Sequence, residues 1–537
     1  MATAPSLALR SLLTSVLRDT GLQSPLQRIS GATAPVRALV IATAAKRLSD
    51  GVVLFVVPTD AEIDTSCADI SFFLSVLEGS AGTVVERQVL PFPSTQVDPY
   101  RGFQPHLKVA SARARVLHAL ATGSARVVVA SAAALLTRLP EPASILLSSC
   151  EVKPGVDIDP HELANTLVLG GYEPADPVDA HGEFARRGGI FDIFPAGEEL
   201  PIRIEFIGDM VESIRRFDPG TQRSIETLDR FGIVPVREGA PEASSTVPAH
   251  ATLFQFLRTR DAHVWLSEPS DIHTHVSDTW QHVAASYADA VERAKGPEPP
   301  APADLLVGED ELATELATAT VLEELSIGDD SAAEGLAIGV QPTATYHGRI
   351  PDWINDVKSA LVEGDRIVFV AGSHGRAERT IELLKDYEVR AVTATDAGDV
   401  TRGAVVVVEG WLSKGFRLRM PATSGEDGPG AFLIFAESDV FDDERRKGAS
   451  GKKRSASAAF LSDLRDLKVG DLIVHVDHGI GQFVGLKQIS VAGGDVVQEF
   501  LELRYHGDAK LFVPVERLDL IQKYTGGAKP PLDRLGG

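Results

Sequence analysis

The chain has 537 residues, which at about 150 residues per domain suggests three or four domains. It carries 75 acidic and 52 basic side chains, a formal net charge of −23. This acidity argues against a broad nucleic-acid-binding face, because phosphate contacts require clustered lysine and arginine. The mix of 44% hydrophobic and 24% charged residues is typical of folded globular domains and excludes a wholly disordered chain or a coiled coil.

Cysteine usage and hydropathy favour a cytoplasmic protein without a membrane partner. Only Cys67 and Cys150 occur, which excludes a disulfide framework and a cysteine zinc site. No stretch approaches the roughly 20 uninterrupted apolar residues that a membrane span needs. We expect residues 1–18 to form an amphipathic helix of the mature protein and not a signal peptide.

Residues 1–138 predict a parallel α/β domain. Apolar, β-branched runs at 52–57 and 126–130 alternate with helical spacing such as that of residues 107–120. We expect residues 219–345 to complete this domain after an insertion.

The insertion is predicted over residues 139–218. Apolar and polar residues alternate with period two in 190–194, 202–206 and 211–215, and Gly208-Asp209 is a hairpin turn signal. This pattern predicts a small antiparallel α+β module.

An acidic run follows in residues 296–348, which hold 11 Asp and Glu residues and no Lys or Arg. One interpretation is a face that repels DNA or copies its charge. We favour the other, a solvated insertion with a short helix around residues 312–325.

The remaining chain predicts three parts. Helix and buried-strand signals return in residues 350–440, which indicates a second α/β domain of unknown role. Residues 441–466 are charged, lack apolar periodicity and are typical of a flexible linker. Residues 467–537 predict a small, mainly β domain.

The first α/β domain lacks a working phosphate-binding loop. The loop requires Gly-x-x-x-x-Gly-Lys-Ser/Thr, and no such octet occurs in the chain. Residues 29–37 retain only Gly31, with Arg37 in place of the lysine. We therefore expect no bound nucleotide here. We expect no metal site either, because His273, His275 and His282 have no convincing carboxylate or cysteine partner, and no catalytic dyad is apparent.

Several stretches resemble a known family. Residues 90–100, 182–195 and 201–219 resemble UvrB and, more closely, the UvrB-homologous front half of bacterial transcription-repair coupling factors. Residues 469–481, 508–515 and 518–524 resemble the RNA-polymerase-interacting domain of that family, a Tudor- or SH3-like barrel shared with CarD-type regulators. The resemblance implies a degenerate RecA-type α/β domain with an inserted module, a second α/β domain and a C-terminal barrel.

The resemblance also implies a function. The family protein is an ATP-driven double-stranded-DNA translocase that removes stalled RNA polymerase and recruits UvrA. Its motor is expected after residue 537, so these residues are expected to act as a scaffold and not as an enzyme. ATP and Mg²⁺ would bind the motor, which would also make most contacts with DNA.

Two partners follow, UvrA and the RNA polymerase β subunit. By resemblance, the inserted module binds UvrA, and the family motif places the key arginine at position 187. The candidate UvrA-binding residues are Phe184, Arg186, Arg187, Arg203 and Glu205. For Arg203 and Glu205 the alternative is that they pair with neighbours across the sheet. Glu173 and Ala185 stand where the family pattern places arginines, so the set is reduced.

The C-terminal domain is expected to meet the polymerase β subunit through a strand edge. The candidate contact residues are Ile489, Val491, Leu501, Leu503 and Lys510. For Ile489 and Val491 the alternative is a place in the barrel core.

Two other functions remain open at this point. A UvrB-like DNA-damage helicase would need the missing phosphate loop and an aromatic-rich hairpin, for which residues 91–103 offer only Phe92, Tyr100 and Phe103. A CarD-like transcription regulator would bind polymerase and not UvrA.

Overall fold

The computed structural model divides into two compact units, Met1–Asp443 and Glu444–Gly537, which we describe separately. The structure describes residues 7–22, 27–48, 50–80, 85, 88–101, 104–178, 180–195, 198, 200–238, 251–258, 260–293, 298–325, 335–394, 403–420, 430–441, 470–475, 479–490, 497–514 and 521–523. Within these residues no helix is long and apolar enough to cross a membrane.

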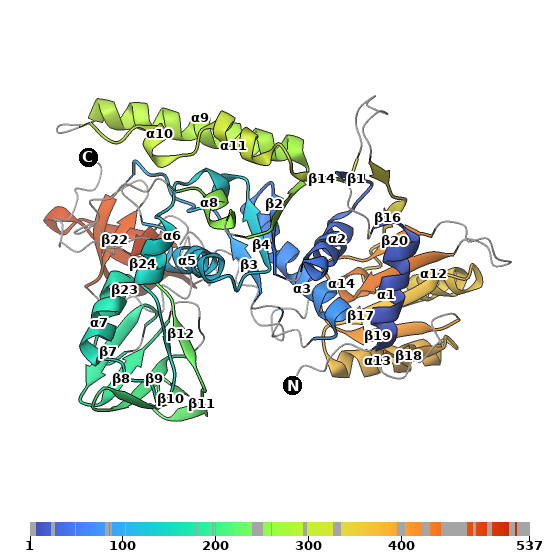
Figure 1. The fold of residues 1–537 in the computed structure, drawn as a ribbon, viewed down its shortest axis with the longest axis horizontal. Helices are drawn as coiled ribbons and strands as arrows, with labels where there is room; N and C mark the ends of the chain where they lie inside the picture. The colour runs from blue at the N-terminus through green and yellow to red at the C-terminus, as the bar shows by residue number, and fades with distance from the viewer. Residues whose placement is uncertain are drawn as a thin grey trace. The chain divides into compact units, whose positions relative to one another are not determined.

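The first unit contains a seven-stranded, wholly parallel sheet (Figure 1). In spatial order its strands are β15 (Leu336–Ala337), β1 (Arg28–Ser30), β14 (Thr320–Glu323), β13 (Ala262–Ser267), β2 (Val52–Val57), β4 (Val127–Ser131) and β3 (Val89–Phe92). Every residue of β2 and β4 is buried, as expected for central strands covered on both faces.

Helices cover both faces of this sheet. One face packs against α1 (Leu7–Asp19), α2 (Ala34–Arg47) and α3 (Ile63–Glu78). The other packs against α5 (Leu107–Thr122), α8 (Leu253–Leu257), α9 (Pro269–Arg293) and α11 (Glu309–Leu316), with α10 (Pro302–Leu305) beside them. Helices α3 and α5 end at Gly79 and Gly123, whose left-handed φ values of 70° and 74° favour glycine. The predicted α/β character is confirmed.

A second, mixed sheet lies in the same unit. Its order is β16 (Val340–Pro342), β20 (Phe416–Arg419), β21 (Ala431–Ala436), β17 (Arg366–Ala371), β19 (Val405–Glu409) and β18 (Ala391–Thr393). Strands β21, β17, β19 and β18 are parallel, while β20 runs antiparallel to both β16 and β21. Helices α12 (Ile350–Val362) and α13 (His374–Asp386) cover one face, and α14 (Glu437–Val440) follows β21.

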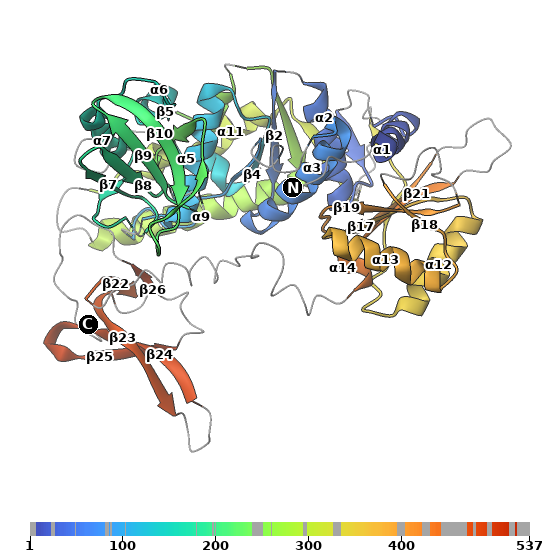
Figure 2. The ribbon, with the colours of Figure 1, turned by 90° about the horizontal axis from the view of Figure 1, so that it is seen from below.

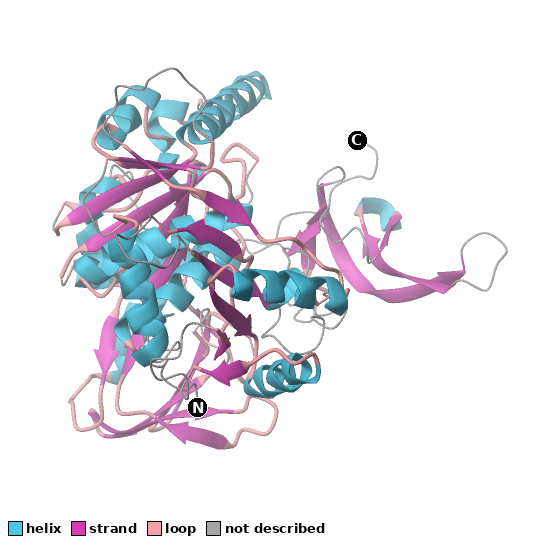
Figure 3. Cartoon of the chain, turned by 90° about the vertical axis from the view of Figure 1, so that its right-hand side faces the viewer, coloured by secondary structure: helices cyan, strands magenta, loops and turns pink. Residues whose placement is uncertain are grey.

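The two sheets share one hydrophobic core. Side chains of α1, α2 and α3 pack between Val53, Phe55 and Val57 of the first sheet and Val368, Val370 and Ile434 of the second. The order of layers is helices, sheet, helices, sheet, helices. Figure 3 shows the helices in cyan and the strands in magenta from a second side. Only Ile338 and Gly339 separate β15 of the first sheet from β16 of the second.

The inserted module is larger than the sequence predicted at its C-terminal end. Its core extends from Val152 to Val236, so residues 219–236 belong to it and not to the α/β domain. It contains β5 (Cys150–Val152), α7 (Pro160–Leu169), β6 (Glu173–Pro174), β7 (Glu183–Arg187), β8 (Ile190–Ile193), β9 (Ile202–Ile207), β10 (Met210–Phe217), β11 (Ser224–Thr227) and β12 (Phe231–Ile233), while α6 (Pro142–Leu147) precedes it. Strands β6 to β11 form one sheet, covered on one face by α7 (Figure 2).

The acidic run is not the solvated insertion that we favoured. The helix α11 ends at Leu316, and residues 320–323 form β14, which lies inside the first sheet between β1 and β13. The predicted helix over 312–325 is therefore present only as far as Leu316 and is wrong beyond it, because Leu322 is buried in a strand.

The second unit contains a five-stranded antiparallel sheet. Its order is β25 (Lys510–Pro514), β24 (Val497–Arg504), β23 (Gly479–Ser490), β22 (Leu472–His475) and β26 (Ile521–Lys523). The long β23–β24 hairpin dominates this sheet (Figure 2). Its core contains Ile473, Phe483, Leu501, Leu503 and Tyr505. The predicted linker 441–466 lies almost wholly outside the described residues.

A buried carboxylate joins the two α/β domains. Asp69 of α3, 1% exposed, accepts hydrogen bonds from the backbone N–H (2.8 Å) and the hydroxyl of Ser413, in the loop between β19 and β20. Next to it, Phe72 packs so closely on Gly410 that a Cβ there would lie 2.6 Å from the ring. Burial raises the pKa of Asp69 to about 7, although the bonds from Ser413 oppose this shift.

We expect the contribution of Asp69 to the stability of the first unit to fall as pH rises from about 4 to about 7. Because the folded-state pKa of Asp69 lies above its ordinary value of 3.8, the native state holds a proton that the unfolded chain has released. Asp69→Asn should therefore gain stability relative to the wild type between pH 5 and pH 7.5, as measured by urea unfolding. Asp60→Asn is the control, because Asp60 accepts the same two kinds of bond from Ser94 at a half-buried position. Equal pH slopes in Asp69→Asn and wild type would contradict the prediction.

Candidate protein-docking sites

The degenerate phosphate loop is filled by the protein itself. Arg37 of α2, 7% exposed, donates to Ser267 Oγ (2.8 Å) and Glu268 Oε1 (2.7 Å), and Glu324 lies 3.6 Å from its second nitrogen. A carboxylate thus neutralises the cation that could otherwise meet a phosphate. Gly31 has φ +82°, and a Cβ there would lie 2.2 Å from the carbonyl oxygen of Ile338. The loop is therefore closed by the backbone of Ile338, the residue after β15.

The second α/β domain repeats this arrangement at the N-terminus of α13. Glu437, which directly follows β21, accepts from the backbone N–H of Gly372 (2.8 Å) and from Arg376 (2.5 Å). Parallel sheets bind ligands in the crevice beyond the carboxyl ends of their strands, and helix N-termini attract anions. In both domains that position carries a side-chain carboxylate paired with an arginine of a helix that begins at the same edge of the sheet.

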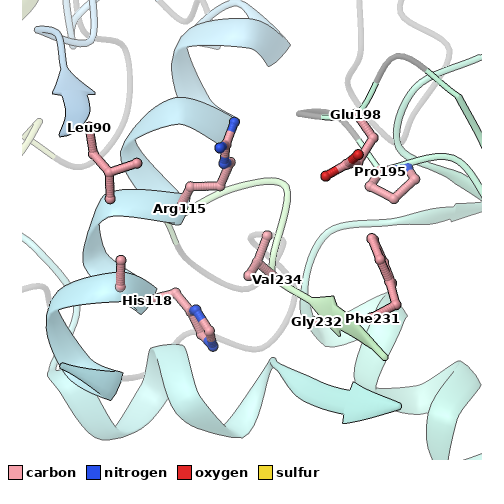
Figure 4. Close-up of a pocket in the computed structure, with 9 residues that line it drawn as sticks. Leu90, Arg115, His118, Pro195, Glu198, Phe231, Gly232 and Val234 are labelled. Carbon is pink, nitrogen blue, oxygen red and sulfur yellow. The ribbon is translucent and has the colours of Figure 1, made fainter. Parts of the chain in front are cut away.

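A small pocket lies between α5 and the inserted module (Figure 4). Its volume is about 170 Å³, and its polar side chains are Arg115 and His118 from α5 and Glu198 from the module. Burial lowers the pKa of His118, so its imidazole is neutral near pH 7. Among the described residues no group of His, Cys, Asp and Glu is arranged to hold a metal ion, and His273, His275 and His282 lie along α9.

The module is fixed to the α/β domain by a buried arginine. Arg113 of α5 is fully buried, lies 4.3 Å from the ring centre of Phe92 and donates to the carbonyl of Pro93 (2.7 Å). It also forms an ion pair with Glu238, the residue at which the chain leaves the module. These contacts of Arg113 therefore hold the module in a fixed position on α5.

The face of the module's sheet opposite α7, which we call the open face, is polar and partly exposed. Cross-strand pairs place two rows on it, Ala185–Asp192–Arg203–Arg215 and Arg187–Ile190–Glu205–Ser213. The alternate residues Phe184, Phe191, Ile204 and Phe206 point into the core instead. Phe184 is 6% exposed, so it supports the sheet and is not available for contact as predicted.

Internal pairs hold two of the predicted contact residues. Arg203 donates to both carboxylate oxygens of Asp192 (2.7 and 2.8 Å) and lies over the ring of Phe217. Glu205 accepts from Ser213 Oγ (2.6 Å) and pairs with Arg215 (3.2 Å). The structure therefore agrees with the alternative prediction, in which Arg203 and Glu205 pair with neighbours across the sheet.

Arg187 is the more available cation. Its side chain is 47% exposed, and its partner Asp176 is 63% exposed. An ion pair this accessible contributes little to stability and exchanges readily for another carboxylate. Arg186 is exposed at the neighbouring position.

Sequence reasoning missed three apolar members of the open face. Ile190, Ile207 and Met210 are 38%, 57% and 38% exposed. Their signal was available, because each breaks the rule that outward positions of an alternating strand are polar.

In the second unit, Leu501 and Leu503 are buried in the core, at 1% and 0% exposure. They cannot form an exposed contact, because alternation turns them inward. Lys510 is exposed on the edge strand β25 and pairs with Glu502 (2.6 Å). Ile489 lies in β23 opposite Gln498, and Val491 falls outside the described residues.

Two parts of the chain match known families. Residues 150–238 match the family described as UvrB interaction domain, which coincides with the inserted module. Residues 467–525 match the CarD-like/TRCF RID domain, which coincides with the five-stranded sheet. Over most of its length, the chain is similar to transcription-repair-coupling factors.

The similarity to these relatives is moderate in identity and broad in coverage. The chain is 26% identical to the transcription-repair-coupling factor of Bacillus subtilis, over 84% of the chain and 42% of the relative. It is 27% identical to the factor of Myxococcus xanthus, over 88% of the chain and 44% of the relative. It is 26% identical to the factor of Escherichia coli, over 84% of the chain and 42% of the relative. The chain thus spans less than half the length of these relatives. The resemblance inferred from sequence is confirmed.

We expect Arg203 and Arg187 to differ in their contribution to stability. Arg203→Met leaves the 4%-exposed Asp192 without its partner, a loss on the order of 3 kcal/mol. Hydrogen exchange of the β8–β10 amides should then accelerate about a hundredfold. Arg187→Met is the matched control and should leave exchange nearly unchanged. Equal exchange in both variants would contradict a structural role for Arg203.

Proposed function

We propose that the chain is a scaffold of the transcription-repair-coupling type, which docks on RNA polymerase and recruits UvrA. The observation that supports this most strongly is the presence, in one chain, of a UvrB interaction domain and a CarD-like/TRCF RID domain. The three transcription-repair-coupling factors that align over 84% to 88% of this chain also support it.

UvrA recognition is assigned in this proposal to the open face of the inserted module. Arg187 supplies an accessible guanidinium on a rigid sheet, a side chain suited to bidentate pairing with a partner carboxylate. The Arg113–Glu238 pair anchors the module, so little ordering of the module itself would oppose binding.

Polymerase recognition is assigned to the second unit. Its sheet has β25 and β26 as outer strands, and an exposed edge can accept a strand of the β subunit. Ile489, Val491 and Lys510 remain our candidates for side-chain contact, while Leu501 and Leu503 are withdrawn because they are buried.

No ATP hydrolysis is assigned to this part of the protein. Glu268 and Glu437 pair with the arginines that a nucleotide phosphate would need. We propose that ATP, Mg²⁺ and most DNA contacts belong to a further part of the whole protein, which would act in the cytoplasm.

The competing functions make different predictions. A CarD-like regulator would bind polymerase without UvrA, and a UvrB-like helicase would require nucleotide binding at Arg37. Calorimetric titration of the chain with purified UvrA, without nucleotide, separates the scaffold from the regulator. Saturable binding supports the scaffold, whereas polymerase binding without UvrA binding supports the regulator.

Arg187→Glu should abolish UvrA binding while leaving the fold intact. The reversed charge would repel the partner carboxylate, and the residue contributes little to the core. Calorimetric affinity and circular dichroism measure the two effects. Arg230→Glu, a charge reversal at a 72%-exposed side chain outside the open face, is the control. Unchanged affinity in Arg187→Glu would reject the site.

Ile489→Arg should weaken binding to the polymerase β subunit by about tenfold or more, because a charge would enter an apolar contact beside the strand edge. Affinity for the isolated β-subunit domain and the thermal unfolding of the second unit are measured together. A lost thermal transition would indicate that Ile489 belongs to the core.

A further inference from the structure

Three apolar side chains gather at one corner of the module's open face. Ile190, Ile207 and Met210 expose 38%, 57% and 38% of their surface. They lie at the ends of the β7–β8 and β9–β10 hairpins, which turn at the same end of the sheet.

The strand register places these residues side by side. Ile190 pairs directly with both Arg187 and Glu205. Ile207 follows Glu205 by two residues on the same face and pairs directly with Met210. Directly paired side chains on an antiparallel sheet lie about 5 Å apart, and diagonal neighbours about 7 Å. The three apolar side chains therefore form one patch with Arg187 at its border.

The fold of the module does not require this patch. The core lies on the opposite face, where Phe191, Ile204 and Phe206 pack against α7. Exposed apolar side chains grouped on a sheet and bordered by charge are typical of protein interfaces, in which an apolar centre carries most of the affinity.

Charge complementarity indicates the chemistry of the partner. Glu205 is already satisfied by Ser213 and Arg215, so it does not demand a basic partner. Among the described residues Arg187 pairs with the 63%-exposed Asp176, which a carboxylate from another protein can replace.

We propose that Ile190, Ile207 and Met210 form the apolar centre of the UvrA-docking surface. The partner segment presents an apolar side chain to this centre and a carboxylate that displaces Asp176 from Arg187. This inference rests on the proposed function and identifies what would supply most of the affinity at that site.

The test compares two apolar truncations on opposite sides of the module. Ile207→Ser should weaken binding of purified UvrA by about tenfold. Leu169→Ser, at a 48%-exposed position of α7, should change it less than twofold. Met210→Gln provides a second substitution in the patch, and thermal unfolding verifies that each variant is folded.

A third variant tests the displacement of Asp176. Asp176→Asn removes the internal competitor of the partner carboxylate, so it should tighten UvrA binding several-fold at low salt, and this gain should shrink at high salt. Unchanged or weaker binding in this variant overturns the displacement.

The possible outcomes separate this inference from the proposed function. If the wild type does not bind UvrA, both are overturned. If the wild type binds and Arg187→Glu abolishes binding, but Ile207→Ser and Met210→Gln behave like Leu169→Ser, only the apolar centre is overturned. Weaker binding in Ile207→Ser and Met210→Gln, with nearly unchanged binding in Leu169→Ser, supports the apolar centre.

Discussion

The architecture of the first unit depends on the burial of α2 and α3 between two sheets. Each of these helices would be a surface helix in an isolated α/β domain, yet here ten residues of each are buried. The resulting core is continuous, so the two α/β domains cannot separate without exposing apolar surface from both. Asp69 and Phe72 on α3 make this junction specific, because they fit Ser413 and Gly410.

A rigid α/β pair of this kind is a suitable platform for a recognition module. The module leaves and re-enters the first domain beside α5, where the buried Arg113 pairs with Glu238. Its sheet uses one face for its own core and leaves the other accessible. On that face, internal ion pairs determine which charges remain available, since Arg203 is committed to Asp192 while Arg187 has only a solvent-exposed partner.

Both α/β domains carry a carboxylate at the carboxyl edge of the sheet, where parallel α/β folds bind ligands such as phosphates. Glu268 follows β13 and Glu437 follows β21, and each pairs with an arginine of a helix that begins at the same edge of the sheet. A built-in anion satisfies the arginine permanently, which stabilises the domain without a ligand.

The sequence by itself determined the element types, the insertion and the family resemblance. Buried runs such as residues 52–57 and the period-two strands of the module are local signals, which need no knowledge of the fold. Which of the candidate residues are free was decided only by the tertiary structure. Three apolar candidates are buried in cores, namely Phe184, Leu501 and Leu503. Two charged candidates, Arg203 and Glu205, form bonds with neighbouring strands. Strand register and packing decide both outcomes, and they depend on residues distant in sequence. The strand in the acidic run was concealed for the same reason, whereas the exposed apolar residues of the module interrupt a local alternation of polar residues and were visible in the sequence.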